Sequence, residues 1–121
     1  SGSSTCFDSG FVTYSNEAKQ RLLNVPPALF GIDGPGAVSE AVVLAMTAGA
    51  IQDSRANLAV AVSGIAGPDG GSEDKPVGTV WISWQWEDTS IARCFHFSGD
   101  REAVRYATVL AALEGCLLLI D

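Results

Sequence analysis

The segment VSGIAGPDGGSEDKPVGTV, residues 62–80, decides the fold because it joins two expected strands through a long glycine loop. It begins inside an uninterrupted apolar run, Leu58–Ser63, which is typical of a strand covered on both faces. It re-enters a strand near residue 77. The glycines of the loop allow positive φ angles and let several backbone amides converge on one point. These glycines are Gly64, Gly67, Gly70 and Gly71.

The glycine loop has two interpretations. Converging backbone amides form a nest for a phosphate or a ribose, which makes the four glycines candidate substrate-binding residues. The acidic residues Asp69, Glu73 and Asp74 oppose a bare phosphate site, and Lys75 partly offsets them. The alternative is a simple turn between two strands.

Residues downstream of the loop predict a hairpin and a helix. Residues 77–86 and 91–97 each alternate in polarity and are separated by a short polar turn, as in an antiparallel hairpin. Asp100 is then placed to cap a helix that runs to about residue 120. The broad apolar face of this helix must lie against a sheet. That face comprises Ala103, Val104, Ala107, Leu110, Ala111 and Leu117.

Residues upstream of the loop predict one more strand and two helices. Residues 6–14 carry aromatic and β-branched side chains, which suit a strand. Ser15 is an N-cap for a short helix over residues 16–23, and Ser39 caps a longer helix to about residue 54. The order of these elements predicts an α/β domain with a mixed sheet and helices packed over it.

Composition limits the classes of function. The chain has 121 residues, 47% of them hydrophobic, so residues 1–121 are interpreted as one domain with one packed core. The net charge is -7 and only two lysines are present, which leaves no basic stripe for a nucleic acid. The apolar run at residues 115–120 is too short to cross a bilayer, and no signal peptide is apparent. We therefore expect a soluble, cytoplasmic protein.

Cysteine and aromatic residues favour neither a metal site nor a disulfide framework. Cys6, Cys94 and Cys116 are odd in number and lack the paired spacing of zinc ligands, so we expect reduced, buried thiols. His96, the only histidine, is interpreted as structural, and no cofactor or metal is predicted. The three tryptophans within residues 81–86 fall on both faces of one strand, which favours an interface and a homo-oligomer.

Five segments occur in order along nearly the whole chain: GFVTYSNEAK (10–19), GAVSE (36–40), GIAGP (64–68), KPVGTV (75–80) and GDRE (99–102). Together they resemble the CinA C-terminal domain. The resemblance implies a three-layer α/β/α sandwich with a mixed sheet. It also implies an amidohydrolase that converts nicotinamide mononucleotide to nicotinic acid mononucleotide and ammonia in pyridine nucleotide recycling. In many relatives a separate N-terminal domain is linked to a pyrophosphatase activity, and any divalent metal would belong to that domain.

The sequence departs from the family pattern at three places. The resemblance implies an upstream helix with the motif ESCTGG, whose serine is a candidate nucleophile. Because the sequence opens at Ser1 and its only methionine is Met46, we expect a domain truncated before that helix. Pro35 stands where histidine is common and removes a polar contact. Asp69 stands where glycine is usual and adds negative charge to the loop.

Hydrolysis of a carboxamide needs a nucleophile, a base and donors for the developing oxyanion. Lys19 is the candidate base because it lies one turn into its helix, where the helix dipole disfavours the ammonium form, and because it ends a family motif. The alternative is a solvated surface lysine. The resemblance makes either Ser3 or Ser4 a candidate nucleophile, proton relay or oxyanion donor beside Lys19. We assign Ser4 as the catalytic candidate and Ser3 as a substrate-binding candidate. The alternative for both serines is an unstructured terminus.

The remaining candidates are less specific. Tyr14 is a catalytic candidate that could hydrogen-bond Lys19 or the substrate, and the alternative is a strand-end aromatic with a solvated hydroxyl. Thr13 and Asn16 are weaker substrate-binding candidates. Arg101, just after the helix cap, could bind a phosphate. Its alternative is an ion pair with an acidic neighbour or a solvated side chain.

Three functions are therefore compared. The leading hypothesis is an amidohydrolase that acts on nicotinamide mononucleotide through a serine and Lys19. The second is a non-catalytic module that binds a nucleotide or a partner protein. The third, nucleic-acid binding, is suggested by the family's link to competence and is opposed by the acidic charge balance.

Overall fold

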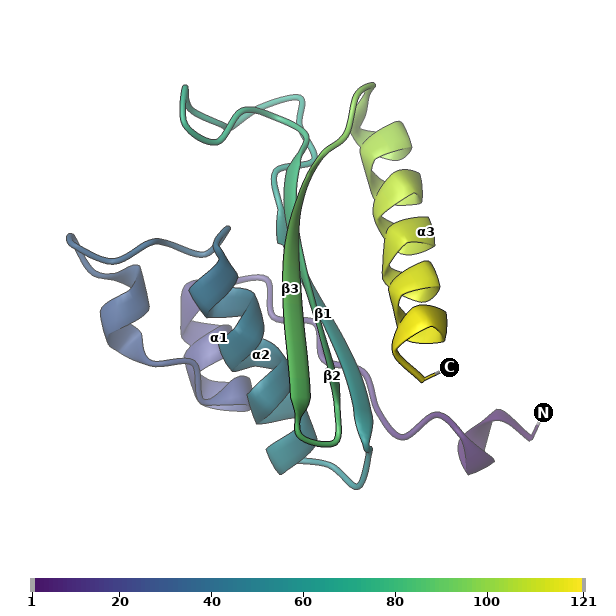
Figure 1. The fold of residues 1–121 in the computed structure, drawn as a ribbon. Helices are drawn as coiled ribbons and strands as arrows, with labels where there is room; N and C mark the ends of the chain where they lie inside the picture. Colours follow the sequence, from purple (N-terminus) through teal and green to yellow (C-terminus); the bar gives the residue numbers. More distant parts are fainter. Residues whose placement is uncertain (1, 121) are drawn as a thin grey trace.

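The computed structural model describes residues 2–120 and has three layers (Figure 1). Helices α1 (Asn16–Leu23) and α2 (Glu40–Gln52) cover one face of a sheet, and α3 (Arg101–Ile120) covers the other. Two short 3-10 helices complete the chain, η1 (Ser3–Thr5) and η2 (Pro27–Phe30). The expected α/β fold, with helices packed against a sheet, is confirmed.

The sheet has three strands in the order β1 (Leu58–Gly64), β2 (Thr79–Trp86) and β3 (Thr89–His96). Both strand pairs are antiparallel; for example, Val62 lies opposite Ile82 in the register. The predicted hairpin is therefore confirmed, with its turn at residues 87–88. Within residues 2–120 the sheet is antiparallel throughout, so the mixed sheet expected from the sequence is not present in this part of the chain.

The predicted strand over residues 6–14 is wrong. This segment runs without strand pairing, and most of its side chains, including Phe7, Val12 and Tyr14, are exposed. Strand propensity measures how well a residue fits a pleated, half-buried surface rather than a preference of the isolated backbone. Within the described chain no neighbouring strand pairs with this segment. Its aromatic and β-branched residues therefore do not form a strand, despite their strand propensity.

All three predicted helix caps are present. The Ser15 hydroxyl accepts a hydrogen bond from the amide of Ala18 at 3.0 Å, and the Ser39 hydroxyl accepts one from Val42 at 3.3 Å. An Asp100 carboxylate oxygen accepts one from Ala103 at 2.9 Å. Each cap satisfies an amide that the first turn of a helix leaves without a backbone partner, and so fixes where the helix begins.

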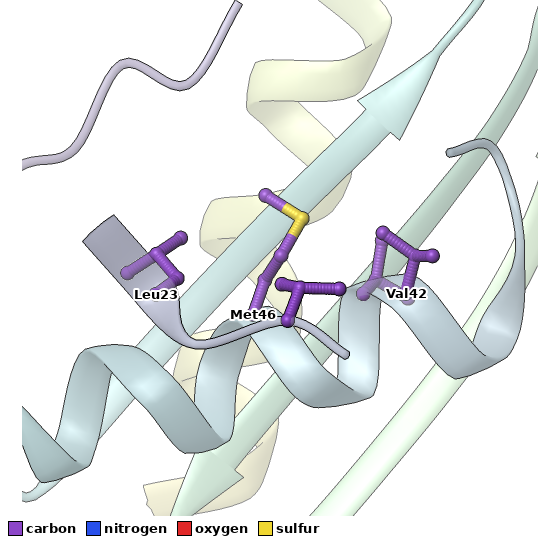
Figure 2. Packing of buried hydrophobic residues seen from close by; sticks show 5 residues of the cluster. Leu23, Val42 and Met46 are labelled. Carbon is purple, nitrogen blue, oxygen red and sulfur yellow. The ribbon is translucent and has the colours of Figure 1, made fainter. Parts of the chain in front are cut away.

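On the α2 side of the sheet, Leu23, Val42 and Met46 pack together in one core cluster (Figure 2). Val42 and Val43 are fully buried, together with Leu23 from the end of α1. Gly49 lets these two helices approach closely, because a Cβ at this position would lie 1.9 Å from the carbonyl oxygen of Leu23. The buried Ser83 hydroxyl of β2 donates to the carbonyl oxygen of Val43, which ties the sheet to α2.

The core on the α3 side is built around Trp84. Its indole Nε1 donates to the carbonyl oxygen of Ala112 at 2.8 Å, and a Cβ at Gly115 would lie 2.1 Å from the indole ring. By length and composition α3 is apolar enough to cross a membrane, which the short run at residues 115–120 did not suggest. Because one face of α3 packs on the sheet through Trp84 and Val104, it is a core helix. Leu110 and Leu117, predicted to face the sheet, are instead exposed.

Candidate functional site

A groove of about 1200 Å³ runs along β1 and contains most of the residues singled out from the sequence. One wall is formed by residues 4–14, and the opposite wall by β1 and the connection that precedes it, residues 54–64. Lys19 lies in the lining, and Leu113 and Cys116 of α3 contribute to it. We call this feature the β1 groove. It is larger than most small-molecule pockets, which are roughly 300–1,000 Å³.

Lys19 is the most unusual residue of the β1 groove. It is 7% exposed, although lysine is rarely buried without a charged partner. Its Nζ donates to the carbonyl oxygen of Thr13 at 2.6 Å, and among residues 2–120 no carboxylate lies within ion-pair distance of it. Helix α1 fixes this geometry, because the Ser15 cap sets the start of the helix and the turn before it brings the Thr13 carbonyl under the side chain.

Burial lowers the pKa of Lys19, because desolvation disfavours the ammonium form and no carboxylate offsets it. A lowered pKa makes the neutral amine, the form that acts as a general base, more accessible than it is for an exposed lysine. The direction agrees with the expectation from the sequence, but the cause is burial rather than the helix dipole. The interpretation of Lys19 as a solvated surface residue is therefore wrong.

The other N-terminal candidates line the same groove, and of these only Thr13, through its carbonyl oxygen, is hydrogen-bonded to the Lys19 ammonium group. Ser4, Thr13, Tyr14 and Asn16 all belong to the lining, and Tyr14 is 89% exposed. Ser4 lies in η1, on the α3 side of the sheet, whereas α1 lies on the opposite side (Figure 1). The described residues therefore do not show a hydrogen-bonded serine–lysine pair.

Ser3 does not line the groove, and its backbone has a local role. Its carbonyl oxygen accepts hydrogen bonds from the amides of Cys6 and Phe7 at 3.0 and 2.7 Å, which closes the turn at η1. The part of the chain that holds both serines is thus ordered into a short helix, contrary to the alternative of an unstructured terminus.

The glycine loop lies apart from the Lys19 end of the groove, at the end of the sheet where β1 stops and β2 begins (Figure 1). Gly67, Gly70 and Gly71 have φ angles of 86°, 92° and 86°, as the sequence predicted. Gly64 does not adopt a positive φ; it is the last residue of β1 and the only one of the four glycines that lines the groove. The structure therefore brings Gly64 together with the Lys19 group and leaves the other three outside it.

Two basic side chains hold the glycine loop to neighbouring elements. Arg101 at the start of α3 donates from Nη1 to the carbonyl oxygen of Gly67 at 3.1 Å. Lys75 donates from Nζ to the carbonyl oxygen of Pro35, in the loop before α2. Among the described residues Arg101 makes no ion pair with an acidic neighbour, which was one alternative considered for it.

The cysteines differ from the sequence expectation. Cys6 and Cys94 are exposed and Cys116 is half-buried, so the three thiols are free but not buried as a group. Burial raises the pKa of the Cys116 thiol, which keeps it protonated. Across residues 2–120 no three His, Cys, Asp or Glu side chains are grouped as metal ligands.

Sequence reasoning missed the contribution of the α2–β1 connection to the groove. Arg55 and Asn57 belong to the lining, and Arg55 adds a second positive charge to it. No motif marks these residues. They reach the groove only because α2 and β1 pack against each other, which local patterns do not reveal.

Three kinds of similarity place the chain among known proteins. A family model described as "CinA C-terminal domain" matches residues 1–120. The protein named "Nicotinamide-nucleotide amidohydrolase PncC" from Pseudomonas putida is 57% identical over 118 residues, which cover 98% of this chain and 72% of the relative. The protein of the same name from Escherichia coli K12 is 52% identical over 114 residues, covering 93% of this chain and 68% of the relative.

A solved structure supports the same grouping. The competence/damage inducible protein CihA from Agrobacterium tumefaciens superimposes with a TM-score of 0.94 and 43% sequence identity, covering 99% of this chain and 73% of that chain. A "CinA-like protein" from Geotalea daltonii is 52% identical, but this chain covers only 27% of its length. The matched region therefore occurs both in short relatives and as part of much longer ones.

Proposed function

Because this chain belongs to the CinA C-terminal domain family, we propose that it is a domain of a nicotinamide-nucleotide amidohydrolase, with nicotinamide mononucleotide as its substrate. The products are nicotinic acid mononucleotide and ammonia. The observation that carries the proposal is Lys19, a buried amine with a lowered pKa and no carboxylate partner, in the wall of a large groove. An amidase needs such a base.

We propose that Lys19 activates a serine hydroxyl. The neutral amine takes the hydroxyl proton as the serine oxygen attacks the carboxamide carbon. The resulting ammonium then gives that proton to the departing nitrogen, which leaves as ammonia. Water next attacks the ester intermediate, and its proton again passes to Lys19. Lys19 then gives this proton to the departing serine oxygen, which regenerates the serine and the neutral amine and releases the acid product, which ionises to the carboxylate.

Two serines are candidates for the nucleophile. Ser4 lines the groove but lies in η1, on the other side of the sheet from α1, so it would have to move to meet Lys19. The alternative is the serine of the upstream motif that the family resemblance implies. The fixed position of Lys19 and the remote position of Ser4 favour the upstream serine.

The remaining site residues are assigned by position. Thr13 orients Lys19 through its carbonyl oxygen, and Tyr14 and Asn16 lie where they could contact the nicotinamide or the ribose. Gly67, Gly70 and Gly71 are proposed as a phosphate-binding loop that Arg101 holds in place through Gly67. Gly64 connects this loop to the groove. No cofactor is invoked.

Wider properties of the protein are also proposals. We propose that residues 1–121 form one domain, that the protein is cytoplasmic and that it self-associates, because large apolar side chains remain exposed. A mixed sheet would require a further parallel strand. Strand β1 pairs only with β2 among the described residues, so its free edge beside the groove is where such a strand could add.

The first test is ammonia release from nicotinamide mononucleotide. Two samples are needed: this chain, and the chain extended with the upstream serine-containing helix of the Pseudomonas putida relative. Activity in the extended chain only would assign the nucleophile to the upstream segment, and activity in both would assign it to Ser4. In the active form, Lys19→Met should lower kcat by about 10²-fold or more, the usual contribution of a general base. Arg21→Met, an exposed cation on the same helix, is the matched control.

A binding module without turnover is the second candidate function. It is favoured by one observation, the separation of Ser4 from Lys19. Calorimetric titration with nicotinamide mononucleotide distinguishes the two functions. Saturable binding without ammonia release in both samples would replace the amidohydrolase with the binding module.

A further inference from the structure

Strand β3 leaves one edge of the sheet open. It pairs with β2 along one side, and among residues 2–120 no strand pairs with its other side. Proteins usually protect such an edge with a short strand, a bulge, a lysine or a proline. Strand β3 is eight residues long, its pairing with β2 is continuous, and it contains neither lysine nor proline. We call the unpaired side of this strand the β3 edge.

The free backbone groups of the β3 edge belong to its even-numbered residues. In an antiparallel pair every second residue bonds to the partner strand, and the residues between point their N–H and C=O groups away from it. The amide of Phe97, just after β3, donates to the carbonyl oxygen of Gly78 at 2.9 Å, so the odd-numbered residues face β2. None of the residues that point outward is buried. They are Ser90, Ala92, Cys94 and His96.

We propose that the β3 edge is the interface between two copies of this chain, whose β3 strands pair antiparallel about a two-fold axis. The two three-stranded sheets then join into one continuous sheet. Each copy has a single β3 edge, so the assembly closes as a dimer. This inference rests on the self-association proposed above and names the surface that carries it.

The register follows from the free backbone groups and from charge. Because bonded residues of an antiparallel pair lie opposite each other, even-numbered residues of one copy must face even-numbered residues of the other. Two such registers join nearly the whole strand. One is centred on Arg93 and places two arginines directly opposite each other, which destabilises a strand pair. The other is centred on Ala92, and it sets Arg93 opposite Ile91 and His96 opposite Asp88 of the second copy.

Charge supports a second copy as the occupant of the β3 edge. The chain has a net charge of -7, but β3 holds no acidic residue and carries the exposed Arg93 and His96. The nearest acidic residues along the chain are Glu87 and Asp88, in the turn before the strand. In the register centred on Ala92 the imidazole of each His96 meets the Asp88 carboxylate of the other copy. The two-fold axis makes this contact twice.

The helices leave the β3 edge accessible. Helix α3 packs over β1 and β2, and β3 lies in front in Figure 1 with α2 on one side and α3 on the other. Ile91 is 43% exposed, and the guanidinium of Arg93 lies 5.2 Å from the centre of the Phe95 ring. This contact holds the Arg93 side chain along the sheet. Its aliphatic stem would then cover Ile91 of the second copy.

The experiment measures the dimer dissociation constant by sedimentation velocity, for this chain and for the chain extended with the upstream segment of the Pseudomonas putida relative. A thiol reductant in all samples prevents disulfides at the exposed Cys94. We expect both chains to be dimers. Ala92→Pro removes the outward N–H at the two-fold axis without removing a bond to β2, and should raise the dissociation constant by about 100-fold.

Val60→Pro on the opposite edge of the sheet is the matched control. The amide of Ile65 bonds to the carbonyl oxygen of Thr79, so the odd-numbered residues at β1 face β2 and the N–H of Val60 points outward. This proline should leave the dissociation constant unchanged. The Tm of each proline variant verifies that it is folded.

An exchange of charges tests the register. Asp88→Lys should raise the dissociation constant by about 10-fold, because it removes both contacts with His96. Asp88→Lys combined with His96→Asp restores opposite charges across the axis and should recover most of the loss. Glu87→Lys changes the net charge equally without facing His96, so it should have a smaller effect.

Three outcomes would overturn the proposal. If both chains are monomers at every concentration, the β3 edge and the self-association proposed above both fall. If the chains associate but neither Ala92→Pro nor the charge exchange changes the dissociation constant, self-association stands and the interface lies elsewhere. If Val60→Pro weakens association as much as Ala92→Pro, the β3 edge is not the specific interface. None of these readouts depends on amidohydrolase activity.

Discussion

The two helical layers of this protein use apolar helices in different ways. Helix α2 is covered on one side by the sheet and on the other by α1 and η2, so that Val42, Val43 and Thr47 have no exposed surface. Helix α3 is covered by the sheet alone, and only Val104 and Ala112 are buried. An apolar helix is thus packed on two sides in one layer and on one side in the other.

This difference explains why α3 resembles a membrane span in composition. A helix that is apolar on all sides is normally buried on all sides. Helix α2 comes closer to this condition, with five buried residues among its 13, than α3, with two among its 20. The comparison predicts that substitutions in the α2 layer and at the sheet-facing side of α3 will be costly, and that those on the exposed side of α3 will be tolerated in this chain.

The largest effect is expected at Trp84, where α3 meets the sheet. Trp84→Ala removes a buried indole and leaves the carbonyl oxygen of Ala112 without its partner. The free energy of unfolding should fall by about 3–5 kcal/mol. Urea denaturation followed by far-UV circular dichroism measures this loss. A loss below about 1 kcal/mol would mean that α3 is not firmly docked, which contradicts the packing described above.

A matched pair of substitutions compares the two layers directly. Met46→Ala in α2 removes a side chain that is 6% exposed and should cost about 2–5 kcal/mol. Leu117→Ala on the exposed side of α3 removes a side chain that is 63% exposed and should change the stability of this chain by no more than about 0.5 kcal/mol. Equal losses in the same urea titrations would show that this side of α3 is already covered.

Gly115 tests the close approach of α3 to the sheet. In an exposed helix, replacing glycine with alanine gains about 1 kcal/mol. Here the added Cβ would overlap the Trp84 ring, so Gly115→Ala should instead cost about 1–3 kcal/mol. The sign of the change in Tm is the readout. Glu114→Ala, at the exposed neighbouring position, serves as the control and should be close to neutral.

The smallest effect concerns a single proton on Lys19. Burial lowers its pKa below the ordinary value of 10.5. Between the lowered pKa and 10.5 the unfolded chain holds a proton that the folded chain has released, so the free energy of unfolding rises with pH across this window. Lys19→Met removes the desolvated ammonium and should therefore be more stable than the parent chain near neutral pH.

The stability gain of Lys19→Met should shrink as the pH approaches 10.5. Thermal unfolding between pH 7 and pH 10.5 measures this trend, and Arg21→Met should show no such dependence over the same range. A gain that stays constant would mean that the proton on Lys19 is not responsible.

The sequence predicted those features of the candidate site that depend on residues close to one another in the chain. Lys19 was identified from its motif and its place in a capped helix. Its burial could not be predicted, because it depends on how residues 4–14 and β1 enclose the side chain. Arg101 was identified as a residue at a helix start, but its partner, the carbonyl of Gly67, lies 34 residues away. The role of Ser4 also depends on where the N-terminal segment runs, which no local pattern specifies.

The sequence by itself determined the caps, the helix lengths, the hairpin and the positive φ angles of the glycine loop. Each of these depends on residues within a few positions of one another, since a side chain caps an amide three residues away and an alternating pattern repeats every second residue. Only the tertiary structure decided that residues 6–14 do not pair as a strand, that Lys19 is buried and that α3 exposes half of its apolar surface. These outcomes depend on which distant segments are present to pair and pack, and that information is not local.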